Sequence, residues 1–460
     1  MKDTERWAQR VLGGAILGDA RRTDRLVRMA ARAAETPAGK VTQVFRNLAE
    51  RQASYDLLEN EAVAPDCLTQ TLARSTMHAC STHDRVLIVM DGTSLTLTDR
   101  AAAKGLGRIG PFKARACGLK LINALALTVE GEPLGVAEQI WWARQRRAPT
   151  GGYRRSRERE SVHWRDAVAR IGEHAGSLAP DTKLHFIADR EGDAALLMRA
   201  IMDAGHEFTI RSNANRKVLG CRARVSVRGT LRCRKPVAKM TVALRASPRR
   251  AARFAELDVR AARLDVRMRD HHIHDTRIVP LTFIWARERR RQGGVDWMLV
   301  TNTEIGSAHD ACEAVRRYAR RWRIEDFHRT WKSGLCNVED TQLRTRNAIL
   351  KWATVLAAVA SRAEQLRHQS RTEPDAPAET AFSRDEIDAL VTLKTEIKRR
   401  TETVSADGLT VATAVHWVAE IGGWVRQKSP PGATTIGRGL ERVEFAARLM
   451  ARLRGAGRMR

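Results

Sequence analysis

The sequence predicts an α/β fold with a mixed sheet at its centre and helical regions at both ends. Two short runs, 85–91 and 183–189, are rich in aliphatic residues, as expected of strands that are buried on both faces, and each run ends in an aspartate. Residues 1–70 and 384–460 instead carry apolar residues at helical spacing. We therefore expect the strands in the middle of the chain and helices at its two ends.

The composition is that of a long and strongly basic chain. Its 460 residues suffice for two or three domains, and 81 Lys and Arg against 53 Asp and Glu give a formal net charge of +28. Such a charge favours a polyanion, DNA or RNA, as partner. No apolar run approaches the roughly 20 residues that cross a bilayer, and no signal-peptide core is present. We expect a cytoplasmic bacterial protein associated with the nucleoid, without a membrane partner.

The cysteines and histidines give no sign of a metal site of the zinc type. Seven cysteines are scattered along the chain without a Cys-x2-Cys pair, which argues against both a disulfide framework and a zinc site. The cluster His271, His272 and His274 has no fourth ligand in the sequence, so we interpret it as a surface loop.

The first 70 residues are expected to form a helical domain. Asp19 follows a glycine and supplies an N-cap for a helix that displays Arg21, Arg22 and Arg25 on one turn. Arginines in this arrangement suit contacts to DNA phosphates or base edges. A solvated basic helix would show the same pattern, and the sequence leaves both interpretations open.

Three carboxylates suggest a metal-dependent phosphoryl-transfer site. Asp91 and Asp189 follow the two predicted buried strands, and Glu325 lies on a distant predicted helix. Carboxylate oxygens are the ligands that Mg²⁺ prefers, and two ions can activate the attacking oxygen and stabilise the leaving one. Taken singly, each aspartate could instead be an ordinary turn residue or helix cap.

Residues 318–332 contain no Gly or Pro and are predicted to form one continuous helix. At about 100° per residue, four polar side chains share one narrow face, which we expect to stay open: Tyr318, Arg321, Glu325 and Lys332. The opposite face is apolar and is expected to pack on a core through Ile324, Phe327 and Trp331. The alternative for the polar face is a solvated surface with charge pairs at i,i+4.

Residues between and after these motifs complete the predicted architecture. Residues 207–211 and 295–301 resemble strands, and the Arg-rich stretch 212–294 alternates Val, Leu and Thr, which predicts an inserted β-rich subdomain with a basic face. A helix at 348–366 is expected to pack against the core. Residues 369–383 resemble a linker, and helices follow to the end of the chain.

In combination, these motifs resemble one family of bacterial insertion-sequence transposases, the Asp-Asp-Glu enzymes of the transposon-five type. The polar face matches the Tyr-x2-Arg-x3-Glu-x6-Lys signature of that family, and Asp91-x-Thr93 and Asp189-Arg190-Glu191-x-Asp193 match its local motifs. The resemblance covers nearly the whole chain in order. It implies a ribonuclease-H-like core at 71–368, an end-recognition domain at 1–70 and, after the linker, a dimerisation domain at 384–460.

The resemblance also implies residue roles. Asp91, Asp189 and Glu325 would be the catalytic residues and would bind two Mg²⁺, with Mn²⁺ as a substitute, and Trp297 would stack on a base flipped from the duplex. The residues that would contact DNA are Tyr318, Arg321, Lys332, Arg211, Arg216, Trp297, Arg21, Arg22, Arg25, Lys40 and Tyr55. The implied reaction is excision by nicking and hairpin formation, then strand transfer into target DNA, by a homodimer that bridges two element ends.

Two alternatives remain open from the sequence. A nuclease with the same three carboxylates could cleave DNA without joining it. A catalytically inactive DNA-binding protein derived from a transposase would also retain these motifs.

Overall fold

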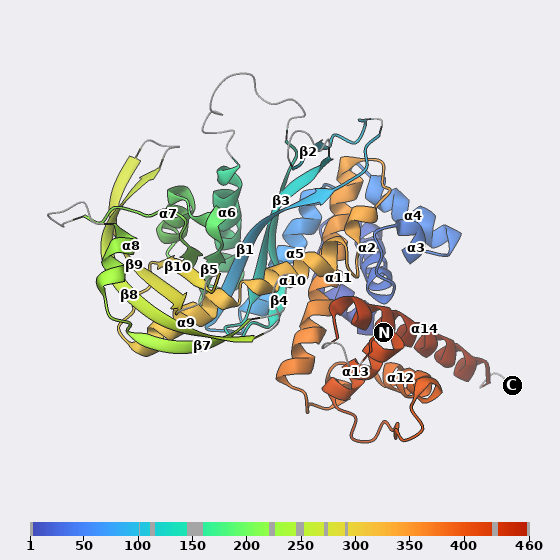
Figure 1. Cartoon of the computed structure of the whole chain (residues 1–460). Coiled ribbons are helices and arrows are strands. Elements are labelled where there is room, and N and C mark those ends of the chain that lie inside the picture. The colour runs from blue at the N-terminus through green and yellow to red at the C-terminus, as the bar shows by residue number, and fades with distance from the viewer. Residues whose placement is uncertain are drawn as a thin grey trace.

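The computed structural model describes residues 3–100, 102–110, 116–144, 160–219, 226–244, 253–270, 275–289, 293–425 and 431–457. Within these residues the strands join into one ten-stranded sheet in the order β2-β3-β1-β5-β6-β10-β9-β8-β7, with β4 paired to β3. Helices from both ends of the chain lie together beside one end of this sheet (Figure 1). The predicted α/β class is therefore confirmed, while the histidine loop at 271–274 lies outside the described residues.

The N-terminal region is helical as predicted. Its helices are α1 (Asp3–Leu12), α2 (Ala20–Glu35), α3 (Val41–Val44), α4 (Leu48–Glu59) and α5 (Pro65–Cys80). Asp19 is the N-cap of α2 and accepts a hydrogen bond from the backbone N–H of Arg21. The expected domain boundary at residue 70 falls inside α5. It does not separate two cores, because the apolar core of these helices is continuous with that of the sheet.

The central strands combine parallel and antiparallel pairing. They are β1 (Arg85–Thr96), β2 (Gly107–Arg108), β3 (Cys117–Leu127), β4 (Pro133–Trp142), β5 (Lys183–Ala188) and β6 (Glu207–Arg211). β1, β5 and β6 are parallel neighbours, and β3 and β4 form an antiparallel hairpin beside β1. The expectation that the first strand ends at Asp91 is wrong: β1 continues to Thr96 because β3 still pairs with it after β5 has ended.

The two faces of the sheet are covered by different helices. Alternate residues of β1 enter two apolar cores, Leu87 and Val89 on one face and Ile88 and Met90 on the other. The second face is covered by α6 (Ser161–Leu178) and α7 (Ala195–Asp203), and the first by α10 (Trp322–Lys332) and α11 (Arg346–Thr372). Asp91 follows the alternation and faces α10.

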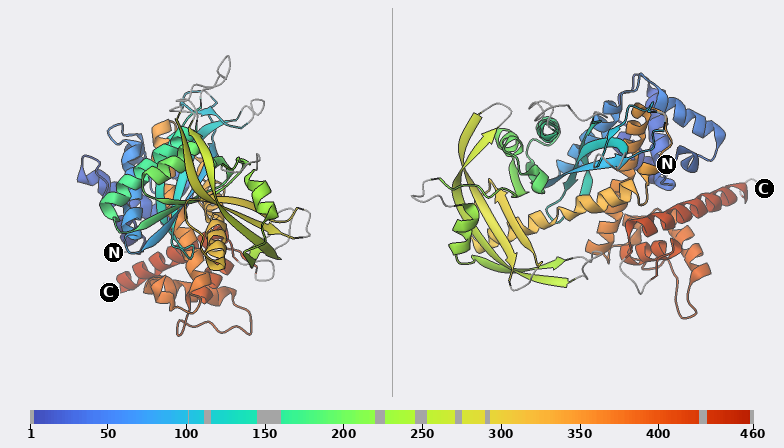
Figure 2. Two further views of the ribbon diagram at one scale, coloured as in Figure 1. Left: turned by 90° about the vertical axis from the view of Figure 1, so that its left-hand side faces the viewer. Right: turned by 45° about the horizontal axis from the view of Figure 1, so that its top comes forward.

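The segment 212–294 extends the central sheet and does not form a separate β subdomain. It contains α8 (Val227–Cys233), β7 (Ala238–Leu244), β8 (Arg253–Asp270) and β9 (Asp275–Glu288). β9 pairs with β10 (Asp296–Thr301), whose edge would otherwise be open, and β7 and β8 continue outward (Figure 2).

The predicted helix 318–332 is two helices. α9 (Ala308–Ala319) ends and α10 (Trp322–Lys332) begins across Arg320 and Arg321, which both keep αR dihedral angles. Here the backbone tightens into bonds three residues apart, for example from Arg321 N–H to the Tyr318 carbonyl at 3.0 Å. Figure 1 shows the two helices following one another beneath the sheet.

The chain after α10 is helical, and the part that follows α11 has a core of its own. Its elements are η4 (Val338–Asp340), α11 (Arg346–Thr372), η5 (Ala378–Thr380), α12 (Arg384–Ile397), α13 (Val411–Ile421) and α14 (Ala433–Gly457). α11 is longer than predicted, so the first residues of the expected linker 369–383 are helical. Gly422 and Gly439 let α13 and α14 touch, because a Cβ at Gly439 would lie 1.7 Å from the Val418 carbonyl oxygen.

Candidate active site

The two aspartates lie side by side on neighbouring parallel strands. Met90 pairs with Ala188 across β1 and β5, so Asp91 and Asp189 are the next residues on strands that are about 4.8 Å apart. Asp189 directly follows β5 and accepts a hydrogen bond from the Glu191 backbone N–H at 2.7 Å, as the cap of the short helix η3 (Arg190–Gly192). Asp189 is therefore a turn residue and a site residue at once.

Helix α10 brings the glutamate to the same edge. His328 Nδ1 lies 3.6 Å from Asp91 Oδ2, and Lys332 Nζ donates to Thr93 Oγ1 at 3.3 Å, so α10 lies along β1. Glu325 is one turn before His328 and shares its side of the helix. Its Oε1 accepts a hydrogen bond from Arg321 Nη2 at 2.5 Å. The structure thus gathers Asp91, Asp189 and Glu325 from three elements.

The electrostatics of the site favour the uncharged form of the Asp91 carboxyl. Burial raises the pKa of the Asp91 carboxyl to about 7; the Arg321 guanidinium opposes this rise, whereas the carboxylates of Asp189, Glu325 and Glu191 add to it. A divalent cation would relieve this repulsion, and carboxylate oxygens are suitable ligands for a hard ion. Among the described residues no group of three His, Cys, Asp or Glu side chains is already placed to hold a metal. Glu325 is paired with Arg321 instead.

Sequence reasoning missed a buried polar group that contacts Asp91. His328 Nε2 lies 3.0 Å from Asn123 Nδ2, and Asn123 Oδ1 accepts from Gln139 Nε2 at 2.8 Å. Burial and the nearby cations Lys332 and Arg321 lower the pKa of His328 to about 3. The signal in the sequence was a single Asn in the otherwise apolar run 121–127, opposite a strand that carries Gln139.

The polar face predicted for residues 318–332 is only partly open. Tyr318 is 2% exposed and its ring meets Trp297 edge-on, with 5.4 Å between centroids and 70° between planes. Trp297 is itself 7% exposed. Because the tight turn at Arg320 and Arg321 ends α9, Tyr318 points into the sheet. The expectation that Tyr318 lies on an open face is therefore wrong for this conformation.

The predicted DNA-binding arginines at and after the end of β6, Arg211 and Arg216, are engaged within the protein. Arg211 Nη2 donates to the Asp296 carbonyl at 3.1 Å. Arg216 is largely buried, forms an ion pair with Asp193 and donates to Ser212 Oγ at 3.0 Å. In this conformation both arginines stabilise the chain around β6 through these contacts, and neither forms an ion pair with Asp91, Asp189 or Glu325.

Two predicted DNA-binding lysines are paired with acidic residues of η4, another feature that sequence reasoning missed. Lys332 Nζ lies 3.7 Å from Glu339 Oε1, and Lys40 Nζ lies 3.1 Å from Asp340 Oδ2. η4 therefore lies where a catalytic-helix lysine and an N-terminal lysine converge. No pattern in the sequence marked these two acids as partners of lysines that are distant in the chain.

The remaining predicted DNA contacts lie on the N-terminal helices, away from the carboxylates. The Arg21 side chain is 91% exposed beside Asp19. Arg22 donates to the Leu17 carbonyl at 2.9 Å and thereby stabilises the turn before α2. Arg25 is partly exposed, and Tyr55 packs partly buried against the core.

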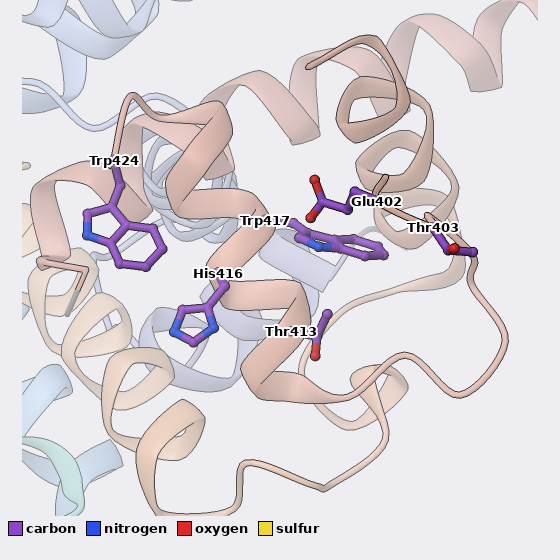
Figure 3. A pocket seen from close by; sticks show the side chains of 6 residues that line it. All are labelled: Glu402, Thr403, Thr413, His416, Trp417 and Trp424. Carbon is purple, nitrogen blue, oxygen red and sulfur yellow. The ribbon is translucent and has the colours of Figure 1, made fainter. Parts of the chain in front are cut away.

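A separate hollow of about 530 Å³ lies in the C-terminal region. Figure 3 shows its lining, with the stacked rings of His416 and Trp424 on one side and Glu402 and Trp417 beyond them. All of its lining residues lie between 402 and 424, so it is not part of the carboxylate site.

Two protein-family models match this chain. The model described as transposase DNA-binding matches residues 4–63, which cover α1 to α4, and the model described as transposase DDE domain matches residues 144–361. The second match includes Asp189 and Glu325 and begins after Asp91. Among the described residues no helix is both long and apolar enough to span a membrane. The chain therefore belongs to the insertion-sequence DDE transposases, DNA-cleaving and DNA-joining enzymes with a ribonuclease-H-like core that generally use divalent metal ions.

Proposed function

We propose that this protein excises an insertion element by metal-dependent nicking and hairpin formation and inserts it elsewhere by 3′-hydroxyl strand transfer. The convergence of Asp91, Asp189 and Glu325 at one edge of the sheet carries this proposal. Their mutual repulsion, which helps to raise the pKa of Asp91, supports the binding of a cation. A buried carboxylate held among other carboxylates has little value for stability alone.

The three carboxylates would hold two Mg²⁺, and Mn²⁺ would substitute. Bound there, the ions would supply an activated oxygen nucleophile and stabilisation of the leaving oxygen. Arg321 orients Glu325 by its hydrogen bond and is itself buried, which fixes its guanidinium beside the site. Lys332 reaches the Thr93 hydroxyl from the end of α10 and would neutralise a phosphate of the bound strand.

The DNA path would involve both ends of the chain. Residues 1–70 would recognise the element end. On the turn that carries Arg21, Arg22 and Arg25, the Arg21 side chain is the most exposed. Hairpin formation would require Trp297 to receive a flipped base, and this needs the Tyr318 ring to move off Trp297 first. The coupling of base flipping to Tyr318 is thus part of the proposal.

A homodimer bridging two element ends would use the C-terminal region 384–460. α14 carries an apolar stripe at i, i+4 and i+8 whose residues Phe445, Leu449 and Leu453 are 57%, 50% and 64% exposed. An exposed apolar stripe of this kind favours a protein contact. A second copy of the same helix would cover it symmetrically. The dimer would act on nucleoid DNA in the cytoplasm.

The decisive experiment incubates the purified chain with Mg²⁺ and a labelled duplex that carries the terminal repeat of the element. We expect metal-dependent nicks and a hairpin-sized product on a denaturing gel, and neither with Asp189→Ala. Asp181→Ala is the matched control, because Asp181 is an exposed aspartate on the loop before the same strand. It should cleave like the unmodified protein.

The same experiment separates the alternatives. Supplying a precut end with a free 3′-hydroxyl and a supercoiled plasmid tests joining. Cleavage without joined product would identify a nuclease, and tight binding without cleavage in either protein would identify an inactive DNA-binding relative.

A further inference from the structure

A row of buried polar side chains crosses three strands and ends at Asp91. Asp91 lies opposite Asn123 on β3, and Asn123 lies opposite Gln139 on β4, so the three side chains share one face of the sheet. His328 of α10 lies over the first two. Burying such groups costs free energy unless they are hydrogen-bonded to one another.

The hydrogen bonds of the row run in one direction. Gln139 Nε2 donates to Asn123 Oδ1 at 2.8 Å, which leaves Asn123 Nδ2 to donate to His328 Nε2 at 3.0 Å. A neutral imidazole that accepts at Nε2 carries its hydrogen on Nδ1. Nδ1 is the ring nitrogen that lies 3.6 Å from Asp91 Oδ2. If the hydrogen bonds ran the other way, the lone pair of His328 Nδ1 would face the Asp91 carboxylate. Repulsion between the two therefore also favours the tautomer with its hydrogen on Nδ1.

We propose that His328 is a positioning residue for Asp91, and that Asn123 and Gln139 hold its tautomer. The Nδ1–H group of His328 fixes Oδ2 of the carboxylate and leaves Oδ1 for the metal ion. This inference rests on the proposed role of Asp91 as a metal ligand. The present separation of 3.6 Å is longer than a hydrogen bond, and a shift of under about 1 Å would close it.

The arrangement differs from that of a histidine that only stabilises the sheet. His185 of β5 is also buried, and its two nitrogens meet Glu207 Oε2 at 3.0 Å and Thr209 Oγ1 at 2.8 Å. Both of its partners lie on β6, away from the aspartates. His185 therefore provides a control of the same residue type that is also buried and hydrogen-bonded.

The test measures the Mg²⁺ and Mn²⁺ concentrations that give half-maximal cleavage of a labelled element-end duplex by the full chain. His328→Leu removes the donor, and His328→Asn keeps an N–H at the position of Nδ1. Groups that orient a metal-binding carboxylate typically contribute about 10- to 100-fold to metal affinity. We expect the metal concentration for half-maximal cleavage to rise about 10- to 100-fold in His328→Leu and less than about fivefold in His328→Asn. Both variants should reach the maximal rate of the unmodified protein at saturating metal.

Calorimetric titration of the DNA-free protein with Mn²⁺ gives a second readout and should show the same order of affinities. His185→Leu, checked for folding by its melting curve, should keep the metal requirement of the unmodified protein. If both His328 variants lost cleavage activity equally while the metal requirement stayed unchanged, His328 would be purely structural and the proposal would be overturned. Asp91→Asn keeps the two failures apart: if it cleaves normally, the proposed ligand set is wrong whatever the His328 variants do.

Discussion

The metal requirement of DNA cleavage should depend steeply on pH because of Asp91. The pKa of its carboxyl is raised from 3.8 to about 7, first by burial and then by its acidic neighbours. A raised pKa means that the metal-free site holds a proton at pH 6 that it has mostly lost at pH 8. A metal ion that binds the carboxylate must displace this proton, so acid weakens metal binding.

The size of the effect follows from the pKa. With a value of about 7, roughly one carboxyl in eleven is ionised at pH 6 and roughly ten in eleven at pH 8. The Mg²⁺ concentration for half-maximal cleavage should therefore rise about tenfold from pH 8 to pH 6. Cleavage at saturating Mg²⁺ should change much less, since the metal then holds Asp91 ionised at both pH values.

The assay measures initial cleavage rates of a labelled duplex against Mg²⁺ concentration at pH 6, 7 and 8 and constant ionic strength. Glu191→Gln removes one repelling carboxylate whose Oε2 lies close to β1 at Gly92, so the pH dependence should become shallower. A half-maximal Mg²⁺ concentration that changes by less than about twofold between pH 6 and pH 8 in the unmodified protein would refute this account of the site.

Three further variants test other parts of the structure. Burial raises the pKa of Glu138 from 4.5 to about 7, so its contribution to the free energy of unfolding is fully present below about pH 4.5 and is lost as the pH rises through about 7. The unmodified protein should therefore lose about 3 kcal/mol of stability over this range, and Glu138→Gln should abolish that loss. Urea unfolding at pH 5 and pH 8 measures the difference. Lys351 donates to two backbone carbonyls at the C-terminal end of α4 at 2.9 and 2.7 Å, and Lys351→Met should cost about 3 kcal/mol, seen as faster amide exchange in α4. Glu339→Gln frees Lys332 and should tighten DNA binding about two- to fivefold in fluorescence anisotropy at low salt; unchanged or weaker binding would contradict competition between Glu339 and phosphate.

The sequence predicted those features that depend on near neighbours in the chain. The apolar stripe Ile324, Phe327 and Trp331 is fully buried, as its helical spacing required. Asp189 stands directly after a buried strand, as the run of apolar residues before it predicted. The helical ends of the chain and the mixed central sheet followed from the same local patterns.

Only the tertiary structure decided the features that depend on partners distant in the chain. β1 continues past Asp91 because β3 pairs with it, and the insertion joins the main sheet because β9 completes the edge of β10. Tyr318 is buried because Trp297 receives it, although helical spacing placed it on an open face. Likewise, His328 became a neighbour of Asp91 only when α10 packed on the sheet. Spacing within one element fixes which side chains share a face, but the surface that meets that face is set by pairing and packing with other elements of the chain.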